Sequence, residues 1–148
     1  MKRKNKADKT AGRGEFVVGS TSTDKSYTTT TTLANVSDDV SVDMGKSETW
    51  VIRWTIPYDD GAGKLSTSVY SSVAPALLTF YGNDKVQNTS YSTKITQATA
   101  DAGIEEVICT VKNGTTASTI YLQACQGSSN AEATKVLKGC SVIAWLVG

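Results

Sequence analysis

The stretch that decides the fold is ETWVIRWTIPY, residues 48–58. Every second position in it holds a large apolar side chain, in the order Trp50, Ile52, Trp54, Ile56 and Tyr58. Side chains alternate between the two faces of a strand, so this period predicts a β-strand with one face in the core. The other face shows Arg53 and Thr55. Pro57 cannot donate to a strand ladder, and the DDGAGK that follows predicts a turn.

Two features of that turn resemble ligand-binding motifs, but neither matches its motif completely. GAGKLS resembles a phosphate-binding loop, but Tyr58 stands where the Walker pattern requires Gly, and Leu65 replaces the metal-binding Ser or Thr. The Asp59-Asp60 pair is where a metal would be sought first, yet no DxDxDG spacing is present. We therefore expect a solvated turn, with no metal and no cofactor.

Outward from this strand the chain is rich in Thr, Val, Ser, Ile and Tyr, which favours an all-β protein. Further strands are expected at residues 16–20, 27–33, 40–44, 65–69, 77–81, 94–98, 106–112, 118–125, 135–137 and 141–147. Asn113-Gly114 predicts a hairpin between two of them. One helical turn is expected within 96–106, interrupted by Gly103. Many short strands with regular turn signals indicate an antiparallel sandwich or a barrel.

The chain divides into a polar arm, residues 1–15, and one domain, residues 16–148. The arm carries two acidic groups against six basic ones, which are Lys2, Arg3, Lys4, Lys6, Lys9 and Arg13. The rest carries nine basic and twelve acidic groups, so any attraction to phosphate lies in the arm. By composition the arm has no fold of its own.

Composition also disfavours several functions. The chain has no His, so a Ser-His-Asp or Cys-His nucleophile cannot be built from it, and we expect no enzyme and no catalytic residue. The basic start lacks the apolar segment of a signal peptide, and no long apolar run predicts a membrane span. The three cysteines, Cys109, Cys125 and Cys140, are therefore expected to be reduced, although a Cys125–Cys140 bridge is geometrically open.

The last expected strand, SVIAWLVG, is apolar on both faces. Val142, Ala144 and Leu146 form one face, and Ile143, Trp145 and Val147 form the other. A strand that is apolar on both faces predicts a second covering layer, which here suggests a neighbouring subunit. We therefore place an oligomer interface at Ile143, Trp145 and Val147.

Aromatic residues offer a second kind of binding surface. Trp50, Trp54 and Tyr58 share the apolar face of one strand and are expected in the core. A sugar-stacking surface would need exposed rings, for which Tyr70, Tyr81 and Tyr91 are the candidates. The Thr-rich run at residues 20–33 reads equally as a linker or as an edge strand that packs against a partner.

Taken together, residues 40–147 resemble the small jelly-roll domains of tailed-phage and other virion structural proteins. SETWVIRWTIPYDD is similar to an early strand and turn of that family, and the segment from VKNGTT to KGCSVIAWLVG is similar to its closing pattern. Cys140-Ser141 and Ala74-Pro75 depart from the usual motifs. The resemblance implies a jelly-roll β-sandwich, architecturally similar to tumour-necrosis-factor-like domains, that often assembles as a trimer around its last strand.

The resemblance thus implies a non-enzymatic virion protein, made in the host cytoplasm, without a membrane partner. We expect a capsid-decorating or capsid-associated trimer whose arm docks on other virion proteins. Two alternatives stay open. One is an icosahedral shell protein whose arm contacts nucleic acid, with a steep salt dependence of binding. The other is a receptor-binding or carbohydrate-binding module.

Overall fold

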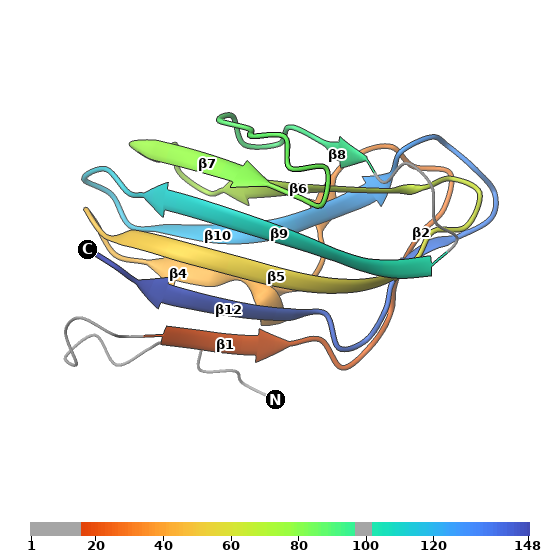
Figure 1. Cartoon of the computed structure of the whole chain (residues 1–148), viewed down its shortest axis with the longest axis horizontal. Helices are drawn as coiled ribbons and strands as arrows, with labels where there is room; N and C mark the ends of the chain where they lie inside the picture. The colour runs from red at the N-terminus through yellow and green to blue at the C-terminus, as the bar shows by residue number, and fades with distance from the viewer. Residues whose placement is uncertain (1–15, 97–101) are drawn as a thin grey trace.

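The computed structural model describes residues 16–96 and 102–148 (Figure 1). Within them are twelve strands and one short 3₁₀ helix, η1, at Asp38–Val40. The strands are β1 (Phe16–Ser20), β2 (Lys25–Tyr27), β3 (Ala34–Asn35), β4 (Val42–Met44), β5 (Thr49–Asp59), β6 (Leu65–Ser71), β7 (Leu77–Tyr81), β8 (Ile95–Thr96), β9 (Ala102–Lys112), β10 (Ser118–Gln126), β11 (Thr134–Val136) and β12 (Ser141–Leu146). The described chain is therefore all-β, and its strand pairs are antiparallel.

The first sheet, sheet A, is built around β5. Strand β9 pairs with β5 along its whole length, from Thr49↔Lys112 to Asp59↔Ala102. On the other side of β5 lies β12, followed by β1 at the sheet edge. Strand β11 pairs with the end of β5 that β12 does not reach, and β2 pairs with β11. On the other side of the sheet, β7 pairs with β9. Figure 1 shows β1, β12, β5, β9 and β7 side by side in this order.

The second sheet, sheet B, lies behind the first in Figure 1. Its central pair is β10 and β6, joined from Ile120↔Ser71 to Gln126↔Leu65. Strands β3 and β4 both pair with the free side of β10, and β8 pairs with β6. The two sheets share one buried apolar cluster, so the described chain is an antiparallel β-sandwich.

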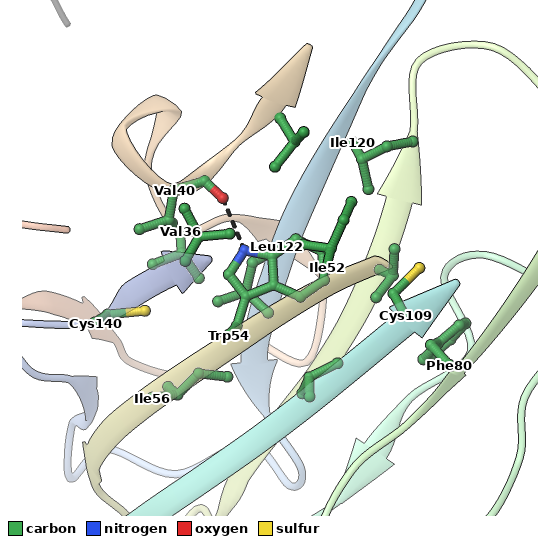
Figure 2. Close-up of a cluster of buried hydrophobic side chains, with 14 of the residues drawn as sticks. Val36, Val40, Ile52, Trp54, Ile56, Phe80, Cys109, Ile120, Leu122 and Cys140 are labelled. Carbon is green, nitrogen blue, oxygen red and sulfur yellow. Dashed lines mark hydrogen bonds between the residues drawn. The ribbon is translucent and has the colours of Figure 1, made fainter. Parts of the chain in front are cut away.

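The core confirms the prediction that residues 48–58 form a strand with one face buried. Trp50, Ile52, Trp54 and Ile56 are at most 1% exposed and belong to one buried cluster with Ile120 and Leu122 of sheet B. Figure 2 shows Ile52 and Trp54 beside Leu122. The Trp54 indole N–H donates to the Val40 carbonyl at 2.7 Å, so the polar atom of this large side chain is satisfied inside the core. Helix η1, which presents that carbonyl, is capped by Ser37, whose Oγ accepts from the Asp39 N–H at 3.0 Å.

The expected strand at residues 27–33 is wrong. Strand β2 ends at Tyr27, and residues 28–33 form a loop in which Thr29 has a φ of 53°. The buried Gln126 side chain holds this loop, because its Oε1 accepts from the Thr30 N–H at 3.3 Å and from the Asn130 N–H at 3.1 Å. A contact with β10 thus overrides the β-propensity of threonine.

The expected Asn-Gly hairpin is also wrong. Strand β9 lies in sheet A and β10 in sheet B, so the connection at Asn113-Gly114 crosses between the sheets. Asn113 is buried, and its amide nitrogen donates to the Gly45 carbonyl at 2.9 Å while its oxygen accepts from Ser118 Oγ at 2.7 Å. The side chain that suggested a tight turn instead fastens this connection to the end of β4.

The helical turn expected within residues 96–106 is contradicted where the structure describes it, because 102–106 belong to β9. Gly103 pairs with Tyr58, and a Cβ at Gly103 would lie 2.9 Å from the Tyr58 hydroxyl, which explains a glycine there. Residues 97–101 of this expectation, and the whole arm at residues 1–15, lie outside the described residues.

The DDGAGK segment forms a turn, as predicted. Gly61 and Lys64 have φ angles of 52° and 59°, the left-handed conformation that tight turns require. Contrary to the expected solvated pair, Asp60 is buried at 2% exposure, and its carboxylate accepts the Leu65 N–H. Asp59 stays exposed. The pair therefore contributes one carboxylate to the fold and one to the surface.

Candidate functional site

The outer face of sheet A carries a set of exposed and half-buried apolar side chains, which we call the apolar face, and Arg53 and Thr110 stand among them. Its members point outward because their neighbours along each strand point into the core. The strand register aligns them in rows: Phe16, Trp145 and Val51 in one, and Val18, Ile143, Ile108 and Tyr81 in the next. Leu77 extends the face on β7. An apolar surface that spans five paired strands is typical of a protein-interaction site.

Strand β12 divides its residues as the sequence suggested. Val142 and Ala144 are buried, whereas Ile143 and Trp145 are each 40% exposed and Val147, just beyond the strand, is 53% exposed. Phe16 and Val18 on the adjacent β1 are still more exposed, at 60% and 58%. Neither residue was predicted from the sequence to lie at the interface, although their pairing with Trp145 and Ile143 makes them part of the same surface.

One ion pair lies within the apolar face. Arg53 on β5 pairs with the Glu106 carboxylate on β9, and the two side chains are 46% and 38% exposed. Their charges cancel locally, so covering this part of the face leaves neither of these two charges unpaired. Beside Glu106 lies an open hollow of about 330 Å³ lined by Tyr81, Gly82, Asn83, Lys85, Glu106 and Ile108.

The outer face of sheet B differs in kind. Tyr70 on β6 and Tyr121 on β10 are cross-strand partners with ring centroids 6.3 Å apart. Tyr91, in the loop before β8, meets Tyr70 edge to face at 5.8 Å. Two of the three tyrosines selected from sequence therefore come together, and Tyr121 joins them. The third, Tyr81, lies on the apolar face of sheet A.

The three cysteines are free and buried, as expected from the sequence. Burial raises the pKa of Cys109, and it raises that of Cys140 from an ordinary 9.0 to about 12. Burial also raises the pKa of Cys125, against a smaller opposite effect of Lys94. The thiol, not the reactive thiolate, is therefore the form held in the core.

We expect all three thiols to resist alkylation by iodoacetamide in the native protein at about pH 8 and to react once urea unfolds it. Mass spectrometry counts the adducts. The folded chain holds the Cys140 proton to higher pH than the unfolded chain does. The neutral thiol therefore contributes its full stability below pH 9, and this is lost as the pH rises towards 12. Rapid native modification of any one thiol would contradict this burial.

In the described ranges no group of three or more His, Cys, Asp or Glu side chains is placed to hold a metal ion. Likewise, no helix within 16–96 or 102–148 is long and apolar enough to cross a membrane. The six basic residues of the arm lie outside the described part of the chain.

In comparisons with protein-family models, curated proteins and solved structures, no match to this chain is found. What is established is thus the class of protein, an all-β antiparallel sandwich. Its candidate functional surfaces are the apolar face of sheet A and the tyrosine cluster on the outer face of sheet B.

Proposed function

We propose that this chain is a non-enzymatic structural protein of a virus or phage particle. In this proposal it is a jelly roll that assembles as a trimer through the apolar face and is anchored to the particle by residues 1–14. The observation that carries the proposal is the apolar face itself, which a stable water-soluble particle component needs to cover.

The order in which the strands pair supports a jelly roll. The pairs are nested: β1 with β12, β4 with β10, β5 with β9, and β6 with β8. Successive pairs alternate between sheets A and B. A long antiparallel ribbon wrapped around a core gives this order, because each outer pair encloses the next, and such wrapping is the double Greek key of a jelly roll.

The position of the apolar face supports self-association. It lies over β1, β12, β5, β9 and β7, so its centre is a flat sheet rather than a flexible loop. A specific interface buries about 800 Å² on each partner and is usually most apolar at its centre. The exposed Phe16, Ile143 and Trp145 supply aromatic and aliphatic anchors of the type that dominate such interfaces.

The charge distribution supports a tethering arm. The arm holds six of the fifteen Lys and Arg residues, in front of a domain with more acidic than basic groups. Such an arm suits an acidic or carbonyl-rich surface on a neighbouring virion protein. Packaged nucleic acid is the alternative partner, and it would make binding strongly dependent on salt.

Deleting residues 1–14 tests the tether. We expect the shortened chain to keep the same mass by light scattering and the same low ratio of absorbance at 260 and 280 nm. It should fail to bind again to particles, purified from the source culture, from which the full chain has been stripped. Retained binding to these particles would overturn the tether. A marked loss of bound nucleic acid on deletion would favour the shell-protein alternative.

The control is a full-length chain in which Lys2, Arg3, Lys4 and Lys6 are replaced by glutamine. It keeps the length of the arm while removing four of its six positive charges. Weak binding of this variant shows that charge makes the attachment. Full binding assigns the attachment to the uncharged part of the arm.

A further inference from the structure

The tyrosine cluster on the outer face of sheet B points to a second binding surface, and we propose that it binds a neutral glycan through stacking of sugar rings. The cluster consists of Tyr70, Tyr91 and Tyr121. The ring centroid of Tyr70 lies 5.8 Å from that of Tyr91 and 6.3 Å from that of Tyr121. Three separate segments of the chain thus contribute to one platform. This inference does not depend on the proposed role in a particle.

The platform is held in place by backbone and side-chain contacts. Tyr70 and Tyr121 stand on paired strands in the middle of sheet B. The loop that carries Tyr91 is fastened to β6, because the Ser92 N–H donates to the Val69 carbonyl at 2.8 Å and Ser68 Oγ donates to the Thr93 carbonyl at 2.7 Å. The rings are therefore positioned before a ligand arrives, which lowers the entropy lost on binding.

The surroundings of the platform are polar and nearly uncharged. Gln123 donates to Asn35 Oδ1 at 3.0 Å on one side, and Thr119 donates to Asp43 Oδ1 at 2.7 Å on the other. Within the described residues, the three tyrosine hydroxyls form no hydrogen bond. A glycan offers both the apolar C–H face that stacks on a ring and the hydroxyl groups that pair with amides and phenols.

Two comparisons favour a glycan over other partners. The exposed apolar side chains without a polar group, which suit a protein partner, gather on sheet A at Phe16, Val18, Leu77 and Ile143, whereas the outer face of sheet B carries the tyrosine cluster. A nucleic acid also stacks on aromatic rings, but its phosphates need cations. Beside this platform Asp43 would repel phosphates, and the nearby cation, Lys94, donates its ammonium group to the Thr31 carbonyl.

An open hollow next to Tyr91 extends the platform. It measures about 420 Å³ and is lined by Ala74, Pro75, Ala76, Leu78, Thr89, Ser90 and Tyr91. This volume lies within the range of about 300–1,000 Å³ that is typical of small-molecule sites. A chain of two or more sugars can thus stack on the tyrosines and place one unit in the hollow.

The test starts with the full chain on an array of neutral oligosaccharides built from hexoses and N-acetylhexosamines. The best binder is then titrated into protein carrying ¹³C-labelled tyrosine and followed by NMR. We expect a Kd in the micromolar to millimolar range and shifts of the Tyr70, Tyr91 and Tyr121 ring signals. The Tyr81 signals, from the opposite sheet, should stay in place. Tyr91→Ala should weaken binding by at least about tenfold.

Val86→Ala is the control variant, because Val86 is 58% exposed and belongs neither to the ring contacts nor to the lining of the hollow. It should bind as the unmodified chain does. Tyr121→Leu provides a second variant that keeps an apolar side chain on β10, and we expect the same loss as for Tyr91→Ala. Absence of binding on the array would overturn the proposal. Binding that leaves the three tyrosine signals unmoved would also overturn it.

Discussion

Replacing Ile143 and Trp145 together by glutamate is expected to convert the proposed trimer into monomers at micromolar concentration. Both side chains are 40% exposed in the single chain and lie on β12, between the apolar residues of β1 and those of β5. In a trimer each subunit would bury two carboxylates without partners, and each such buried ion costs several kcal/mol. Size-exclusion chromatography with light scattering should show three times the 15.7 kDa of one chain before the exchange, and a single chain after it.

Val73→Glu is the matched control for this prediction. Val73 is 38% exposed, close to the value for Ile143, but it follows β6 and lies outside the apolar face. This variant should keep the full assembly mass. Circular dichroism then checks that each variant is folded. An unmodified chain that is a stable monomer at micromolar concentration would count strongly against the proposed trimer. A double variant that stays trimeric would place the interface elsewhere.

Replacing Trp54 by alanine will remove a large part of the folding free energy. Trp54 is fully buried between the sheets, and truncating such a side chain costs about 3–5 kcal/mol. The change also leaves the Val40 carbonyl without its donor, an added cost of about 1–3 kcal/mol. For a domain whose total stability is about 5–15 kcal/mol, the result is a marginal or unfolded protein.

Trp54→Phe separates the two contributions. Phenylalanine keeps most of the apolar volume but loses the indole N–H and part of the ring system, so we expect about 1–3 kcal/mol for the unpaired carbonyl and a smaller cavity cost than for alanine. Urea unfolding followed by circular dichroism measures both variants, at one protein concentration because assembly adds to apparent stability. If Trp54→Ala cost less than about 1 kcal/mol, the core between the two sheets would be wrongly placed.

The sequence predicted those parts of the fold that depend on local alternation. Strand β5 follows from its period of two, and β12 follows from a short apolar run in which the outward Ile143 and Trp145 alternate with the buried Val142 and Ala144. The path of residues 28–33 was not predictable in this way. It depends on Gln126, which is 96 residues from Thr30 in the chain and gives no local sign of its role.

The candidate surfaces were predictable to a similar degree. Outward-facing residues on one strand can be read from sequence, but their neighbours depend on register between distant strands. Phe16 joined the apolar face through its pairing with Trp145, and Tyr121 joined the tyrosine cluster through its pairing with Tyr70. For Asn113 the local signal was misleading, because the same dipeptide serves a tight turn and a crossing between sheets.

The place of β12 in sheet A also bears on how this protein is made. Among the described residues it is the last strand, yet it lies between β1, the first described strand, and β5. While the ribosome still holds residues 141–146, β1 has no neighbour and one side of β5 stays open over most of its length. Unpaired strand edges of this kind invite aggregation, and contacts between such distant residues form slowly. Over that interval the edges of β1 and β5 are therefore exposed to pairing with other chains.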